Sequence, residues 1–251
     1  MEAGYDIGGA LEERSYLNGH SPPEEHKVLT IGNRIIGTLQ NIVVFSGLPK
    51  AGKSTFLNGC IASGYTQFPI FSMSILTPKG RKKICYIDTE SGEYDFYRSI
   101  GRVKSILQLS DMPPTFSAYR FRDCNPSDIQ QYTEYYLEHN KDCSVLFIDG
   151  FLDLLMNYND EVESRRLINW LKKITGQYNI LLIGVVHTGK KDGMTLGHFG
   201  SMIDRYCQSV LTVEKSEKDQ TFELKAKFLR SDIAFEPIRI VNEMGYFRQI
   251  N

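Results

Sequence analysis

The sequence predicts an α/β fold with a mainly parallel sheet flanked by helices and an antiparallel C-terminal strand extension. Two observations support this prediction. Short, continuously apolar runs alternate with helical patterns, which is typical of strands that are covered on both faces and joined by crossover helices. After residue 205 the helical patterns give way to successive strand-like segments, and these favour antiparallel pairing at one edge of the sheet.

Composition limits the class of protein. The 251 residues are 41% hydrophobic and 24% charged, enough for the core of one large domain. The net charge of −1 gives no global basic field that would attract nucleic acid. We expect no membrane partner, because no apolar run approaches the roughly 18 residues of a membrane span. Five cysteines without a C-x-x-C pair favour a reducing, cytoplasmic location and disfavour a structural zinc site.

The N-terminal elements follow in order. Residues 1–27 are rich in glycine, proline and charge and supply little to bury, so we expect a flexible N-terminal arm before one domain over residues 28–251. Apolar runs on either side of Gly32-Asn33 predict a hairpin. It leads into a strand from Asn41 to Ser46, whose uninterrupted apolar stretch indicates burial on both faces.

The later elements are predicted from capping signals and apolar runs. Asn125 followed by Pro126 opens a helix that extends to about residue 140. Asp160 and Glu163 resemble a capping box at the start of another helix. The remaining predicted strands lie at residues 84–87, 145–148, 180–186, 209–213, 221–228 and 237–241.

The strongest chemical signal is a phosphate-binding loop. The sequence from Gly47 to Ser54 has the pattern G-x-x-x-x-G-K-S, between a predicted strand and a helix that starts at Lys53. Backbone N–H groups of such a loop wrap a di- or triphosphate, Lys53 pairs with the β and γ phosphates, and Ser54 ligates Mg²⁺. The residues expected to bind the nucleotide are Gly47, Leu48, Pro49, Lys50, Ala51, Gly52, Lys53, Ser54 and Thr55.

Carboxylates on two other strands complete the predicted site. Asp149 ends an apolar strand, the Walker B arrangement in which the Asp holds the hydration shell of Mg²⁺. The next residue is Gly150, where ring ATPases of the AAA+ kind and ABC-type ATPases typically place a catalytic Glu. The base must therefore come from elsewhere, and Glu90, just after the strand that ends at Asp88, is our candidate. Asp88 is the alternative if that strand ends earlier.

At this point the sequence resembles the RecA-like ATPases, which include RecA itself and the hexameric DnaB-type and RepA-type helicases. It looks most like the small RepA-like "AAA family ATPases" of bacterial plasmids and mobile elements, over residues 28–249. The resemblance implies a RecA-like P-loop ATPase domain over residues 28–251, with ATP and Mg²⁺ as its ligands. The matching segments are residues 29–32, the phosphate-binding loop, and residues 86–90, 147–150, 186–187, 228–230 and 235–237.

The resemblance also implies roles for two further residues. His187 corresponds to the polar residue that senses the γ-phosphate and leads into a loop facing DNA, here with Lys190 and Lys191; a histidine that merely ends a strand is the alternative. Arg230 occupies the place of an arginine that reaches the neighbouring subunit's γ-phosphate. DnaB-type proteins carry a lysine where this chain has Phe228, so a surface ion pair is an equal alternative.

These assignments predict a helicase-type motor or helicase accessory in replication or mobilisation of a mobile element. The resemblance implies a homo-oligomer, with a hexamer as one candidate, and single-stranded DNA or replication proteins as candidate partners. The alternative is an ATP-switched regulatory or loading protein that acts through a protein partner with little hydrolysis. A GTPase is disfavoured because residues 140–143 do not form an N-K-x-D motif, and a small-molecule kinase because no arginine-rich lid is evident.

Overall fold

The computed structural model describes residues 7–12, 15–16, 26–189, 197–216, 218–243 and 246–250. Most of the predicted N-terminal arm therefore lies outside the described residues, and so do Lys190 and Lys191 of the loop after His187. Within the arm, Ile7–Glu12 form a short helix, α1, on which Ile7 and Leu11 are exposed. The boundary between arm and domain at residue 28 stays a prediction.

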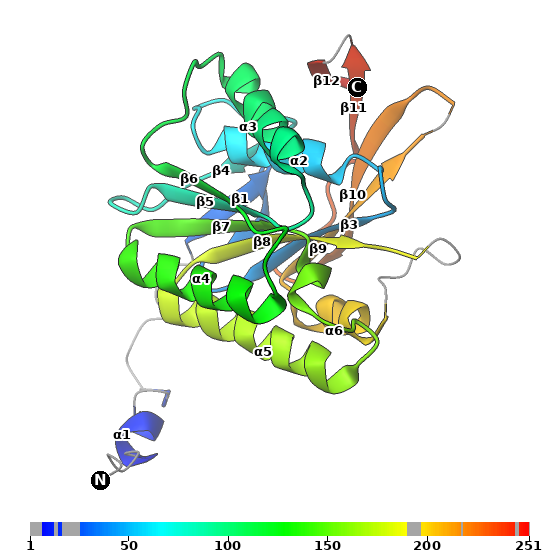
Figure 1. Ribbon diagram of the computed structural model, residues 1–251. Helices are drawn as coiled ribbons and strands as arrows, with labels where there is room; N and C mark the ends of the chain where they lie inside the picture. The colour runs from blue at the N-terminus through cyan, green and yellow to red at the C-terminus, as the bar shows by residue number, and fades with distance from the viewer. Residues whose placement is uncertain are drawn as a thin grey trace.

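A central sheet organises the molecule (Figure 1), and in the described part of the chain it has nine strands in the order β12-β11-β10-β9-β3-β8-β7-β5-β6. The strands from β9 to β6 are parallel, and β10, β11 and β12 extend the sheet by antiparallel pairing. This arrangement confirms the predicted fold class. The strands are β3 (Ile42–Gly47), β5 (Lys83–Asp88), β6 (Phe116–Arg120), β7 (Cys143–Asp149), β8 (Leu181–His187), β9 (Ser209–Lys215), β10 (Thr221–Leu229), β11 (Ile238–Glu243) and β12 (Tyr246–Ile250).

Two apolar cores lie on opposite faces of the sheet. Along β3, Val43 and Phe45 belong to one core and Ile42 and Val44 to the other, which explains the uninterrupted apolar run. The first face carries α2 (Lys53–Ser63), α3 (Glu93–Leu107) and a small sheet of β1 (Lys27–Ile31), β2 (Arg34–Thr38) and β4 (Met73–Ile75). The second carries α4 (Pro126–His139), the 3-10 turn η1 (Phe151–Leu154), α5 (Glu161–Tyr178) and α6 (Gly197–Tyr206).

The predicted hairpin and helix starts are present, with two differences in capping. β1 and β2 pair antiparallel, as predicted. α4 begins at Pro126, but the Asn125 side chain makes no capping bond; its amide nitrogen donates to Asp128 Oδ2 at 3.3 Å. At α5, the Asp160 carboxylate accepts the backbone N–H of Glu163 at 2.8 Å, whereas the Glu163 carboxylate accepts N–H groups of residues 156 and 157. The predicted capping box is therefore only half formed.

The parallel strands bring four predicted segments to one edge. β3 and β8 are neighbours with Gly47 opposite His187, and β5 and β7 are neighbours with Asp88 opposite Asp149. All four residues end their strands. The carboxyl edge of an open α/β sheet is where ligands of such folds bind, so the topology assembles a site from separate parts of the sequence.

Candidate functional site

The predicted phosphate-binding loop follows β3 and ends at the first turn of α2. Gly52 has φ +95°, a conformation that side chains rarely adopt, and a Cβ there would clash with the ring of Phe222. A Cβ on Gly47 would clash with the carbonyl oxygen of Val213. Both motif glycines are thus required by the local packing, and they let the loop close tightly above the positive N-terminal end of α2.

Lys53 lies inside this loop and is buried, with 4% of its surface exposed. Its Nζ donates to the carbonyl oxygens of Gly47 at 3.0 Å and Leu48 at 2.8 Å. Burial lowers the pKa of Lys53 to about 8, although the carboxylates of Glu90 and Asp149 act in the opposite direction. The ammonium group is therefore held at the centre of the loop by backbone carbonyls.

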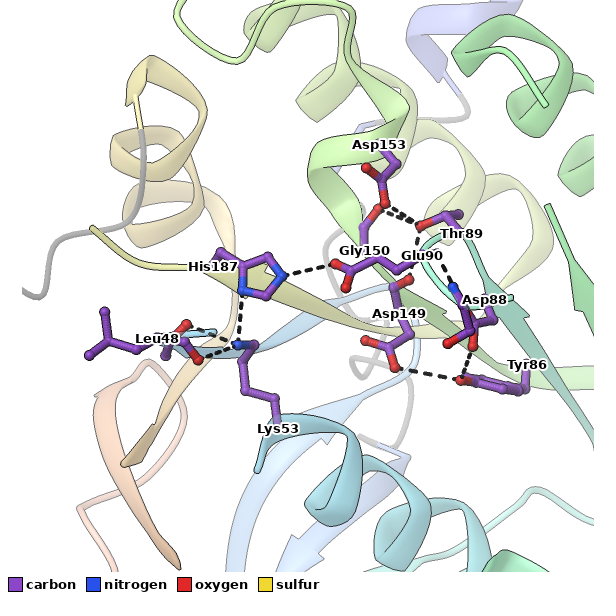
Figure 2. Close-up of polar contacts among 12 residues, drawn as sticks. Leu48, Lys53, Tyr86, Asp88, Thr89, Glu90, Asp149, Gly150, Asp153 and His187 are labelled. Carbon is purple, nitrogen blue, oxygen red and sulfur yellow. Dashed lines mark hydrogen bonds and ion pairs between the residues drawn. The ribbon is translucent and has the colours of Figure 1, made fainter. Parts of the chain in front are cut away.

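His187 connects Lys53 to Glu90 (Figure 2). Its Nδ1 lies 3.0 Å from Lys53 Nζ, and its Nε2 lies 3.0 Å from Glu90 Oε1. A lysine ammonium can only donate, so this network assigns Nδ1 as the acceptor and Nε2–H as the donor to the Glu90 carboxylate. Three residues from α2, β8 and the segment after β5 thus form one hydrogen-bonded chain.

Asp149 is buried at the end of β7, close to other acidic groups. Burial first, and then the charges of Glu90 and Asp88, raise the pKa of Asp149 to about 7, while a hydrogen bond from Ser54 and the charge of Lys53 act in the opposite direction. The Ser54 side chain therefore meets Asp149 at the start of α2. A hydroxyl and a carboxylate side by side are oxygen ligands of the kind that Mg²⁺ prefers.

Asp88 has a structural task at the tip of β5. One of its oxygens accepts the backbone N–H groups of Glu90 at 3.0 Å and Ser91 at 2.7 Å, and the other accepts the Tyr86 hydroxyl at 3.1 Å. Asp88 is 1% exposed, whereas 42% of the Glu90 side chain is exposed. Of the two carboxylates considered as the base, Glu90 is the one that solvent can reach.

Sequence reasoning missed Thr89 and Asp153, for which no motif is diagnostic. The Thr89 hydroxyl lies 2.7 Å from Asp153 Oδ2, 2.9 Å from the Asp149 carbonyl oxygen and 3.1 Å from the Gly150 carbonyl oxygen. Gly150 has φ +116°, and a Cβ there would clash with Thr89 Oγ1. This packing explains why glycine, and no glutamate, follows Asp149. Gly150 was the one sequence signal that pointed to this turn.

A pocket of about 680 Å³ lies beside the loop, on the side of β9. Its size suits a ligand as large as a nucleotide. Exposed Leu48, Pro49 and Lys50 form part of its rim. The other lining residues are Gly47, Ala51, Thr188, Thr212, Val213, Glu214, Lys215 and Lys227.

Arg230 is not brought to this edge within one chain. Leu229, at the end of β10, pairs with Ser209, and Ser209 pairs with Val43 near the start of β3. Arg230 therefore lies toward the amino edge of the parallel strands, where its guanidinium donates to the carbonyl oxygen of Arg205 at 2.9 Å. Any contact between Arg230 and a nucleotide requires a neighbouring copy of the chain.

Among the residues that the structure describes, no group of three or more His, Cys, Asp or Glu side chains has the geometry to hold a metal ion. In the same residues, no helix has the length and apolar character needed to cross a membrane.

Comparisons with known proteins agree with this geometry. A family model described as an AAA domain (AAA_25) matches residues 25–193, about two thirds of the chain. The structure is similar to a KaiC-like protein from the hyperthermophilic archaeon Pyrococcus horikoshii OT3, with a TM-score of 0.62 and 13% identity over 92% of this chain and 100% of the other. A search of curated proteins finds no match. The chain therefore belongs to the AAA_25 family of AAA domains and has the RecA-like P-loop fold.

Proposed function

We propose that this chain binds ATP with Mg²⁺ in the loop over residues 47–55 and hydrolyses it, with Glu90 as the general base. The observation that carries the proposal is the meeting of Lys53, Glu90 and Asp149 at the carboxyl edge, from the start of α2, the segment after β5 and the end of β7. These groups supply a cation for the phosphates, a carboxylate for water and a carboxylate for the metal. The family and the fold support the same activity.

The loop fits a triphosphate. Gly47 and Gly52 let the loop pack closely against Val213 and Phe222, and the N-terminal turn of α2 adds backbone N–H donors and positive potential. Lys53 Nζ already lies on the carbonyl oxygens of Gly47 and Leu48, so its charge is aimed inside the loop before a ligand arrives. When a nucleotide binds, Lys53 Nζ would donate to phosphate oxygens in place of these backbone carbonyls.

Ser54 and Asp149 fit the protein's share of a Mg²⁺ site. Mg²⁺ bound to a nucleotide usually takes one or two protein ligands and keeps water and phosphate oxygens for the rest. Ser54 is exposed at the start of α2 and hydrogen-bonds to the buried Asp149. When bound, the ion supplies positive charge to the phosphates. A bound cation would also stabilise the ionised form of Asp149, which is disfavoured by burial and by the charges of Glu90 and Asp88.

In the proposed reaction, Glu90 accepts a proton from water as the water oxygen bonds to the γ-phosphorus. The bond from the γ-phosphorus to the bridging oxygen breaks, which yields ADP and inorganic phosphate. His187 holds Glu90 Oε1 at 3.0 Å, and we assign the other oxygen to the water. Asp88 fixes the backbone N–H of Glu90, so the base extends from a rigid strand tip. Lys53 stabilises charge on the phosphate oxygens.

For the biological role we propose a RepA-like helicase motor or helicase accessory in replication or mobilisation of a mobile element. The sequence segments described above support this role. The place of Arg230 at the amino edge supports action in trans, so the proposal includes a homo-oligomer. Single-stranded DNA is the partner that we propose from the sequence resemblance.

One experiment tests both the proposed hydrolysis of ATP and the proposed biological role. The ATPase rate is measured with and without single-stranded DNA, and the mass with Mg-ATP is measured by light scattering, with Lys53→Ala as the inactive control. Turnover that depends on Lys53 supports the hydrolase. Stimulation by DNA together with a hexameric mass supports the motor. A slow, DNA-indifferent monomer or dimer overturns the motor in favour of an ATP-switched regulatory protein.

A further inference from the structure

We infer that Asp153 is a positioning residue for Glu90 and acts on it through Thr89. The inference rests on the proposed function, in which Glu90 is the base. Asp153 belongs to η1, the 3-10 turn that follows β7, whereas Glu90 follows β5. The contact between Asp153 and Thr89 therefore ties the segment that carries the base to the strand that carries Asp149.

The geometry of Thr89 supports this assignment. Its hydroxyl has one hydrogen but lies within hydrogen-bond distance of three oxygens, and the shortest distance is 2.7 Å to Asp153 Oδ2. The backbone N–H of Thr89 also donates to the Asp149 carbonyl oxygen at 3.2 Å. The residue before Glu90 is thus held to the end of β7 by its backbone and its side chain (Figure 2).

Gly150 provides a second, independent observation. A Cβ at this position would clash with Thr89 Oγ1 and would lie 2.6 Å from Asp153 Oδ2. The Thr89–Asp153 contact therefore occupies the space that a side chain after Asp149 would need. In this chain the position next to Asp149 carries no carboxylate, and the space instead holds the contact that fixes the segment of Glu90.

The consequence for Glu90 follows from its two supports. Asp88 accepts the backbone N–H of Glu90, and Asp153 holds the residue before it, Thr89. With both in place, Glu90 reaches His187 at 3.0 Å. Loss of the Asp153 contact leaves Glu90 ionisable and present but less well oriented, and misplacement by about 1 Å can cost about 100-fold in rate.

The test compares variants of the full-length protein in single-turnover ATP hydrolysis and in equilibrium Mg-ATP binding. Asp153→Ala removes the acceptor, and Thr89→Val removes the hydroxyl. Asp153→Asn and Thr89→Ser keep a hydrogen-bonding partner. Asp111→Ala, at an exposed position in the connection after α3, is the matched control. Asp153 is exposed, so its replacement removes little from the core, and thermal melting checks that each variant is folded.

We expect Asp153→Ala and Thr89→Val each to lower the single-turnover rate constant by about 10- to 100-fold with nucleotide affinity within about threefold. The conservative variants should stay within about threefold of wild type, and the double variant should be no slower than the slower single variant. On a Glu90→Gln background, Asp153→Ala should have no further effect, because the group that it positions is already missing.

The inference is overturned by a wild-type single-turnover rate for Asp153→Ala, by a loss that appears in nucleotide affinity and not in that rate, or by an equal loss on the Glu90→Gln background. Failure of the proposed function gives a different result: the Glu90→Gln single variant would hydrolyse ATP at the wild-type rate. An equally slow Asp153→Asn assigns the effect to the charge of Asp153 and likewise overturns the hydrogen-bond mechanism.

Discussion

Replacing Asp149 by Asn should stabilise the nucleotide-free protein and at the same time weaken Mg-ATP binding. The carboxylate is buried beside Glu90 and Asp88, which raises its pKa from 3.8 to about 7 in the folded chain. A group with a raised folded pKa contributes stability that is fully present below its unfolded pKa and is lost as pH rises through the folded value. Asn keeps the shape and the acceptor oxygen for Ser54 but removes the charge.

The magnitude follows from the shift. The rise in the pKa of Asp149 from 3.8 to about 7 corresponds to about 4 kcal/mol of unfolding free energy. The increase in unfolding free energy from Asp149→Asn should therefore approach about 4 kcal/mol above about pH 8. The gain should grow by about 1.4 kcal/mol per pH unit between about pH 4 and about pH 7, and level off above. Below about pH 4 both side chains are neutral, and the two proteins should have similar stability.

The assay is urea unfolding of both proteins in chelator at several pH values within this range. Thermal melting with Mg-ATP gives the second half of the prediction, because the wild type should gain more from the ligand than the variant. A stability difference that stays constant with pH would refute the reasoning, since it would show that Asp149 titrates alike in the folded and unfolded chains. An Asp149→Asn variant that is less stable than wild type above about pH 8 would also refute the reasoning.

Three further predictions concern Lys53, the choice of base and Arg230. Lys53→Ala should abolish tight Mg-ATP binding in a titration with a fluorescent ATP analogue, because the loop loses its central cation; unchanged affinity would mean that the loop is not the nucleotide site. Glu90→Gln should lower phosphate release by about 10²–10⁴-fold with affinity within a few-fold, whereas Asp88→Asn, the alternative base, should lose less. Arg230→Ala should leave binding by an isolated protomer nearly unchanged and slow turnover only in an assembly, where Lys53→Ala protomers partly rescue it in mixtures; a normal rate without rescue excludes the trans role.

The sequence predicted the sheet and the loop because both are encoded locally. A strand covered on both faces needs an unbroken apolar run, as in β3, and a loop that wraps phosphate needs Gly47 and Gly52. The edge strands β6 and β12 were missed, because a half-exposed strand such as Phe116–Arg120 carries no such run. The same holds for β4, with three residues.

Part of the site was beyond sequence reasoning for a similar reason. The phosphate-loop motif located Lys53, which begins α2. Glu90 and Asp149 stand just after or at strand ends, so apolar runs located them. The contacts of Thr89 with Asp153 and of Lys53 with His187 span 64 and 134 residues of sequence and depend on the order of the strands in the sheet. Periodicity gives the strands but not which of them become neighbours.

The central position of β3 in the sheet has a consequence for hydrogen exchange and unfolding. β3 pairs on both sides with parallel strands, and Val43, Val44 and Phe45 are fully buried. Amide hydrogens in such a strand exchange with solvent only when most of the molecule unfolds, whereas segments near the periphery exchange through local fluctuations. The nucleotide loop is thus anchored to the slowest-exchanging part of the fold, and deuterium uptake at residues 43–45 should report global unfolding even when the loop itself is empty.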